Sequence, residues 1–244
     1  HGSSQPGGST AGPRPLANDV FYARFGQKLI HLLTTRMPSG ILYEADMRLR
    51  PNGNAGLLVS SLSAFERYQS DDAWTWEHQA LLRARAVAGD PRVAERFAAI
   101  RRAILTRPRD PDVLRTTVVQ MREKMRAALD ASKPGLFDVK QGFGGIADIE
   151  FMVQYEILRS AHAAPELVDW TDNLRLLEGL GRHGTLGSTE VDLLTNAYQV
   201  LRAVYHRNAL QEGHGLVAES ELLEESDLVR ALWRRLMLPG EHSS

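Results

Sequence analysis

Four charged side chains alternate along residues 43–51, where the sequence reads Tyr-Glu-Ala-Asp-Met-Arg-Leu-Arg-Pro. Successive residues of a β-strand face opposite sides of the sheet. Read as a strand, the stretch places Glu44, Asp46, Arg48 and Arg50 in one row on one face. Two carboxylates followed by two guanidiniums are suited to a metal ion and a polyphosphate. A strand with an ordinary solvated face shows the same alternation, so the pattern alone leaves both interpretations open.

A turn-forming run follows at residues 51–56 (Pro-Asn-Gly-Asn-Ala-Gly), and a second apolar stretch occupies 57–59. This order predicts a strand, a turn and a second strand. The charged row is then expected to lie beside a glycine-rich corner.

A second cluster covers residues 137–151 (Phe-Asp-Val-Lys-Gln-Gly-Phe-Gly-Gly-Ile-Ala-Asp-Ile-Glu-Phe), where a glycine-rich turn leads into an apolar helix. Free backbone N–H groups at a helix start bind anions, and Lys140 would add positive charge beside them. An interhelical loop with ordinary caps is the alternative interpretation.

Two carboxylates of this cluster, Asp148 and Glu150, lie roughly 200° apart around the helix axis because they are two residues apart. They therefore cannot grip one metal ion together. Glu150 lies on an apolar flank and needs a partner, for which Lys140 or an arginine from the first part of the chain is available. Either a structural ion pair or an interdomain contact satisfies this need.

The composition is that of a globular protein: of 244 residues, 43% are hydrophobic and 24% charged. No apolar run approaches the ~20 residues that span a bilayer, and no signal-peptide plan opens the sequence, so we expect a cytoplasmic protein without a membrane segment. The absence of cysteine excludes disulfides and thiolate metal sites. A net charge of −1 argues against nucleic acid as a partner.

Several enzyme classes lose support because their motifs are absent. The histidines show no HExxH spacing, and no GxSxG, GKS or strand-associated GxGxxG motif occurs. Carboxylate-and-magnesium phosphate chemistry remains.

Periodicity predicts a mainly α fold in which a small α/β portion precedes an all-helical bundle. We expect a flexible loop or tag at 1–18, a partial α/β domain at 19–89 and a helical bundle at 90–240. Ser63 is a candidate cap for a helix that follows the strands. Asp110 is predicted to cap a helix of about five turns, in which Leu114, Val118, Met121, Met125 and Leu129 form the apolar stripe. Later helices are predicted at 146–162, 173–181, 188–211 and 219–238.

Three ordered blocks strongly resemble the bacterial glutamine synthetase adenylyltransferase family. They are residues 40–51, residues 73–81 (Ala-Trp-Thr-Trp-Glu-His-Gln-Ala-Leu), and residues 137–140 with 144–151. The resemblance runs from about Phe21 to the end of the sequence. It implies an enzyme that regulates nitrogen assimilation and joins, in each of two halves, a polymerase-beta-like nucleotidyltransferase domain to a helical domain.

In that family one half transfers AMP from ATP to a tyrosine of glutamine synthetase, and the other removes it by phosphorolysis. The tryptophan-containing block resembles the C-terminal, AMP-adding half. The resemblance implies Mg²⁺ as the metal and ATP as the substrate, with glutamine synthetase as the target, PII signalling protein as a partner and glutamine as an effector.

The superfamily binds two magnesium ions with three carboxylates, a pair in a Gly-Ser-x-Asp-x-Asp strand and a third on a later strand. Asp46 matches the third and is the predicted catalytic residue and metal ligand, with Glu44 beside it as a second candidate ligand. By their position on the same face, Arg48 and Arg50 are candidate phosphate contacts, as is Lys140 in the later cluster.

The sequence departs from the family pattern because no Gly-Ser-x-Asp-x-Asp precedes Asp46. We therefore expect a fragment that retains the third carboxylate and the helical domain and is inactive alone. The alternatives are the AMP-removing half, a PII uridylyltransferase, and a regulatory module that binds PII protein.

Overall fold

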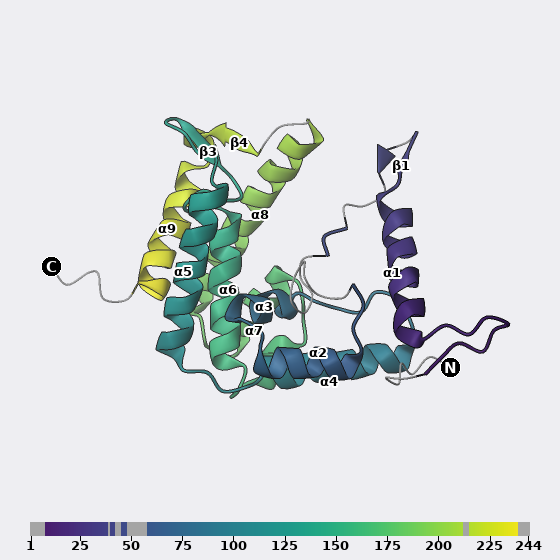
Figure 1. Ribbon diagram of the computed structural model, residues 1–244. Helices are drawn as coiled ribbons and strands as arrows, with labels where there is room; N and C mark the ends of the chain where they lie inside the picture. The colour runs from purple at the N-terminus through teal and green to yellow at the C-terminus, as the bar shows by residue number, and fades with distance from the viewer. Residues whose placement is uncertain (1–7, 39, 42–44, 48–57, 212–214, 239–244) are drawn as a thin grey trace. The chain divides into compact units, whose positions relative to one another are not determined.

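The structure is a computed structural model that describes residues 8–38, 40–41, 45–47, 58–211 and 215–238 (Figure 1). Within these residues α-helices dominate and the strands are only two or three residues long, which confirms the mainly α fold class. The chain divides into two compact units, one made of residues 1–80 and 85–104 and the other of 81–84 and 105–244. The domain limits predicted at residues 18 and 89 stay predictions.

The described residues of the first unit form a helix, a short hairpin and three further helices. They are α1 (Asn18–Thr34), β1 (Arg36–Met37), β2 (Gly40–Ile41), α2 (Leu62–Asp71), α3 (Thr75–Leu82) and α4 (Pro91–Leu105), the last two of which end in the second unit. The hairpin pairs Arg36 with Ile41 and Met37 with Gly40. Ser61, rather than the predicted Ser63, caps α2, because its side chain accepts the Ala64 N–H.

The predicted strand pair is not found where the structure can test it. Residues 45–47 have no regular secondary structure, and Leu58 and Val59 lie in a bend; the remaining residues of the two predicted strands lie outside the described ones. A strand needs a neighbour for its backbone N–H and C=O groups, and an isolated hairpin is marginal in water. Among the described residues, no strand pairs with 45–47.

Helix α1 carries apolar residues at helical spacing, but it buries none of its side chains. Phe25 is 58% exposed and Leu32 is 62% exposed. The apolar stripe of α1 is thus open to solvent in the described part of the first unit.

The second unit is a helical bundle with one small hairpin. Its elements are α5 (Pro111–Leu129), β3 (Leu136–Asp138), α6 (Ile146–Ser160), the 3₁₀ helix η2 (Pro165–Val168), α7 (Asn173–Arg182), α8 (Ser188–Leu210), β4 (Leu216–Ala218), η3 (Glu219–Glu221) and α9 (Leu223–Met237). These helices confirm the four predicted after residue 145 to within a few residues, and α9 begins four residues late because η3 precedes it.

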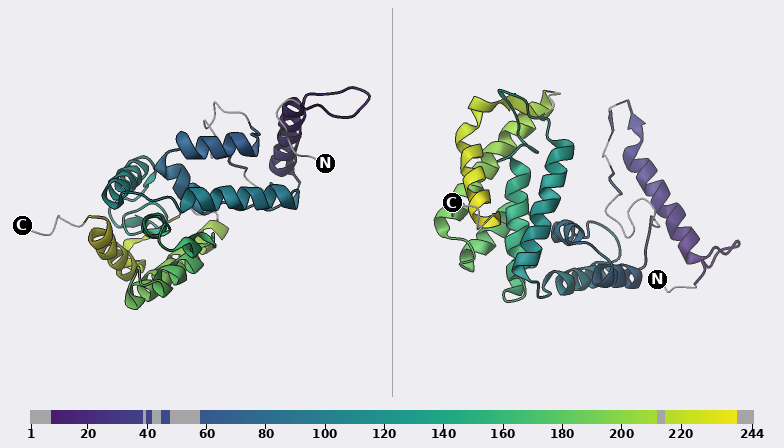
Figure 2. Two further views of the ribbon diagram at one scale, coloured as in Figure 1. Left: turned by 90° about the horizontal axis from the view of Figure 1, so that it is seen from below. Right: turned by 60° about the vertical axis from the view of Figure 1, so that its left-hand side comes forward.

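Helix α6 forms the centre of this bundle. It packs against α5, α7, α8 and α9, and it buries side chains on every face. Figures 1 and 2 both show α5, α6 and α9 side by side, with the β3–β4 hairpin at one end of the bundle. A helix that is buried on every face belongs in a core, and the side chains that α6 buries include the charged residues Asp148 and Glu156.

Helix α5 begins at Pro111, as predicted. The carboxylate of Asp110, the residue before it, caps the helix by accepting the N–H groups of Asp112 and Val113. The buried stripe differs from the predicted one toward the end of the helix. Arg122 is fully buried, whereas Leu129 is 54% exposed. The predicted stripe advances by alternating steps of four and three residues, which is a period of 3.5 residues. A straight helix has a period of 3.6, so the stripe turns away from the buried face by ~20° every seven residues.

Candidate functional site

Of the four charged residues predicted to face a metal and a polyphosphate, the structure describes only Asp46. Its side chain is exposed on an irregular stretch. Glu44, Arg48 and Arg50 lie outside the described residues, so their placement beside Asp46 stays a prediction. No three His, Asp or Glu side chains of the described residues gather closely enough to hold a metal ion. Asp46 is therefore the one predicted metal ligand among the described residues. A single carboxylate needs further ligands to hold Mg²⁺.

The backbone N–H groups of the glycine-rich turn before α6 are already hydrogen-bonded to acceptors within the same segment. The N–H of Gly144 binds Asp148 Oδ2 at 2.7 Å, and that of Gly145 binds the Gly142 carbonyl at 2.9 Å. The N–H of Ile146 binds the Val139 carbonyl at 3.0 Å, and the next two N–H groups are also bonded within the turn. An anion would have to displace these bonds. The geometry therefore favours the interhelical connection over the anion site.

Lys140 lies beside this turn with an exposed side chain, and its Nζ is 5.8 Å from the centre of the Tyr205 ring. Its backbone N–H donates to Asp138 Oδ1 at 3.0 Å. These contacts fix the backbone of Lys140. Its predicted contact with phosphate stays a prediction.

Close packing explains why the turn contains glycine. Gly144 has a φ of +89°, and a Cβ there would lie 2.4 Å from the Ser226 carbonyl oxygen on α9. At Gly142 a Cβ would lie 2.6 Å from the Asp138 carbonyl oxygen. Neither position has room for a side chain, so the turn can approach α9 only with glycine.

Asp148 is held by two arginines of α5 in the middle of the bundle. Its Oδ1 accepts from Arg122 Nε at 2.7 Å and from Arg126 Nη2 at 2.9 Å. The side chains of Arg122 and Asp148 are both 0% exposed. Burial lowers the pKa of Arg122 while Asp148 opposes this shift. Arg122 also donates to the Gln141 carbonyl at 2.7 Å, so the ion pair fastens the glycine-rich turn to α5.

Phe143, at the centre of the turn, lies among arginines. The guanidinium carbon of Arg126 is 4.6 Å from the ring centre, and those of Arg230 and Arg234 lie at 5.9 and 5.6 Å. Arg230 Nε also donates to the Phe143 carbonyl at 2.8 Å. Cation–π contacts and this hydrogen bond link the turn to α9.

Glu150 finds its partners in Arg83 and Tyr198. Arg83 Nη1 lies 2.5 Å from Glu150 Oε1, and the Tyr198 hydroxyl donates to the same oxygen at 3.0 Å. Burial, followed by the charge of Glu150, raises the pKa of Tyr198. Arg83 comes from the part of the chain before residue 89, as one of the two predicted alternatives requires, and it belongs to the second unit. The structure thus gives both Asp148 and Glu150 ion-pair partners within one unit.

The arginines that hold Asp148 were not predicted from the sequence. Arg122 follows Leu114 and Val118 at steps of four, so it lies on the buried side of α5, and an arginine in that place signals a carboxylate partner. The sequence does not show which carboxylate. Tyr198 has no comparable signal, because a buried tyrosine is common.

Two family models match the sequence. One, described as glutamate-ammonia ligase adenylyltransferase, matches residues 3–100; the other, described as GlnD PII-uridylyltransferase, matches residues 116–234. The first covers Asp46, helices α1, α2 and α3 and most of α4, and the second covers most of the bundle.

Curated relatives extend across both matches. The chain is 52% identical over 233 residues to the "Bifunctional glutamine synthetase adenylyltransferase/adenylyl-removing enzyme" of Hahella chejuensis, covering 93% of this chain and 24% of the relative. Proteins of the same description from Nitrosococcus oceani and Pseudomonas aeruginosa are 54% and 51% identical, over 93% and 94% of this chain and 23% and 24% of theirs. The chain spans about a quarter of the length of these relatives.

Proposed function

Because this chain belongs, as a segment, to the family of bifunctional glutamine synthetase adenylyltransferase/adenylyl-removing enzymes, we propose that it is part of the half that transfers AMP from ATP to a tyrosine of glutamine synthetase. The observation that carries the proposal is 52% identity over 93% of the chain to a relative of that description. The tryptophan-containing block at residues 73–81 supports the AMP-adding half. A cytoplasmic location follows from this function.

Asp46 is the residue that we assign to the reaction. When bound, Mg²⁺ neutralises charge on the triphosphate and lowers the pKa of an attacking hydroxyl. The carboxylate of Asp46 is exposed and can contribute one oxygen ligand to such an ion. Glu44 would supply a second, and Arg48 and Arg50 would contact phosphate oxygens of ATP.

The chain alone is not sufficient for transfer. Its sequence contains no Gly-Ser-x-Asp-x-Asp, and in neither Gly2-Ser3 nor Gly8-Ser9 do the aspartates follow. Two further carboxylates must therefore come from residues outside this sequence.

A second role, the binding of PII protein by the helical unit, is favoured by one observation. Residues 116–234 match a family model named for PII-uridylyltransferase. A domain shared by two enzymes of nitrogen regulation is a reasonable place for a shared partner. Glutamine would act as an effector of the intact protein.

Intact-mass analysis of glutamine synthetase after incubation with Mg-ATP tests the transfer. Two proteins are compared, namely this chain and a chain extended upstream with a Gly-Ser-x-Asp-x-Asp strand. We expect an AMP adduct only with the extended chain, and none with its Asp46→Asn variant. Asp71→Asn, at an exposed aspartate that ends α2, is the matched control and keeps the adduct.

Each other outcome has a distinct meaning. An adduct formed by this chain alone contradicts the need for further carboxylates, and an adduct that survives Asp46→Asn removes Asp46 from the site. No adduct from either chain, with release of AMP from adenylylated glutamine synthetase, assigns the chain to the AMP-removing half.

A further inference from the structure

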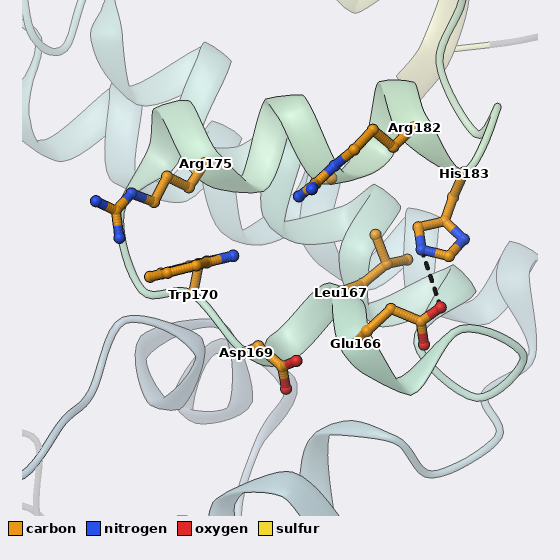
Figure 3. Close-up of a pocket in the computed structure, with 8 residues that line it drawn as sticks. Glu166, Leu167, Asp169, Trp170, Arg175, Arg182 and His183 are labelled. Atoms are coloured by element: carbon orange, nitrogen blue, oxygen red, sulfur yellow. Dashed lines mark ion pairs between the residues drawn. The ribbon is translucent and has the colours of Figure 1, made fainter.

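A hollow of about 260 Å³ lies in the second unit between η2 and α7 (Figure 3). Glu166, Leu167, Asp169 and Trp170 line it from η2 and the residues after it. Arg175, Gly179, Arg182 and His183 line it from α7 and its end. Nothing in the adenylyl-transfer proposal uses these residues.

Trp170 forms one wall of the hollow with its indole stacked under an arginine. The guanidinium carbon of Arg175 lies 4.1 Å from the indole centre, and Trp170 is nevertheless 43% exposed. Asp172 lies beside this pair: its Oδ1 accepts the Arg175 N–H at 3.0 Å, and its Oδ2 is 3.7 Å from Arg175 Nε. A stacked guanidinium keeps the indole in one orientation. The indole is thus stacked against a guanidinium and half-exposed.

Arg182 provides positive charge inside the hollow. Figure 3 shows its side chain extending from the end of α7 back along the helix, in the direction of Trp170. Gly179 lies between Arg175 and Arg182 on the same face of α7 and leaves the space between them open. Among the described residues no carboxylate forms an ion pair with Arg182, whereas the neighbouring Glu166 pairs with His183 at 3.0 Å.

The size and the residue types decide which kind of ligand fits. Small-molecule sites usually enclose about 300–1,000 Å³ and surround most of their ligand. This hollow is smaller, and exposed side chains form most of its wall. Tryptophan and arginine are the residue types that most often carry the energy of protein–protein contacts. An arginine without a carboxylate partner adds a charge that an acidic side chain would complement.

We propose that this hollow is a docking site for a protein partner that presents an aspartate or glutamate to Arg182 and an adjacent apolar side chain to Trp170. The carboxylate accepts hydrogen bonds from the guanidinium, and the apolar side chain covers the exposed part of the indole. The inference is independent of adenylyl transfer, because the hollow shares no residue with the candidate site around Asp46.

Two-dimensional ¹H–¹⁵N NMR of the whole chain tests the proposal, with the indole N–H signal of Trp170 as the readout and Trp170→Phe to assign it. The probe is N-acetyl-Glu-Leu-amide, which carries a carboxylate beside an apolar side chain. The uncharged probe N-acetyl-Gln-Leu-amide is the control. We expect a saturable shift of the Trp170 signal with the first probe and binding at least fivefold weaker with the second.

Variants connect the shift to Arg182. Arg182→Ala should weaken binding of the acidic probe at least fivefold, and Lys124→Ala, at an exposed cation of α5, should leave it unchanged. The spectra themselves show that each variant is folded. Equal shifts with both probes, or no shift with the acidic probe, overturn the proposal. Acetate that shifts the signal as strongly as the acidic probe also overturns it, because the hollow would then take a free anion.

Discussion

Arg122 and Asp148 form an ion pair in which both side chains are completely buried, with 2.7 Å between Nε and Oδ1. The second carboxylate oxygen of Asp148 accepts the Gly144 N–H at 2.7 Å. One carboxylate therefore ties α5, the glycine-rich turn and the start of α6 together. Within the block at residues 137–151, Gly144 and Asp148 both serve this junction.

Asp148→Ala should destabilise the chain by about 3–5 kcal/mol, because it leaves the Arg122 charge buried without a counter-charge. Asp227→Ala is the matched control, since its carboxylate pairs with Arg230 at 2.9 Å while 61% exposed. A surface pair of this kind contributes about 0–1 kcal/mol. Urea unfolding followed by circular dichroism measures both. Equal losses in the two variants would show that the buried pair is not the junction described above.

Gly144→Ala should cost about 3–5 kcal/mol, since it adds both a strained positive φ and a Cβ 2.4 Å from a backbone oxygen. Gly184→Ala isolates the first effect, because Gly184 has a φ of +67° and open space around its Cβ position. Its cost should be about 1–2 kcal/mol. Thermal unfolding of the two variants compares them. A loss at Gly144 no larger than that at Gly184 would mean that α9 moves away freely.

Gly179→Ala should stabilise the chain by about 0.5–1 kcal/mol, because alanine is the better helix former and its Cβ meets only Leu167 Cδ2 at 3.4 Å. Gly181→Ala has the same helical advantage, but its Cβ lies 3.1 Å from Val191 Cγ2. Val191 must shift, so the gain should be smaller or absent. Denaturant midpoints of both variants measure the difference. A larger gain at Gly181 would contradict this packing.

Glu156 should make the stability of the chain fall as pH rises. Burial raises the pKa of Glu156 despite its ion pair with Arg159. A carboxyl with a raised folded pKa binds its proton more tightly in the folded state. Its contribution to stability is therefore complete below the unfolded pKa and is lost as pH rises through the folded pKa.

Glu156→Gln removes this titration. The free energy of unfolding of the variant, relative to the unaltered chain, should accordingly rise as the pH increases above the unfolded pKa of glutamate, about 4.3. Glu178→Gln, at an exposed carboxylate of α7, serves as the control and should show a flatter difference. A relative stability of Glu156→Gln that falls over this range would show that Arg159 outweighs burial.

Local patterns in the sequence predict the helices of the second unit well. Asp110 caps α5 and Asp172 caps α7 through hydrogen bonds to residues no more than three positions away. Such signals need no knowledge of the rest of the chain. The stripe of α5 was predicted less well, since the fit of a sequence period to a real helix accumulates error along its length.

The candidate site was predicted from the sequence less completely than the helices were. Asp46 was predicted as a site residue from its place in a family motif. In the structure it is exposed, and residues 45–47 around it do not form a strand. The predicted strand there depends on partners, which a local alternation of polar and apolar residues does not supply. The anion-binding interpretation of the glycine-rich turn depends in the same way on whether its N–H groups are already bonded.

The sequence by itself determined the mainly α class, the cap of α5, the approximate positions of the later helices, and the family to which the chain belongs. Only the tertiary structure decided that Asp148 is buried against Arg122, 26 residues away, and that Glu150 meets Arg83, 67 residues away. The physical reason is the separation along the sequence between the residues that interact. Helices form from interactions over a few residues, whereas the burial and pairing of a charge depend on whichever distant segments the packed core brings beside it.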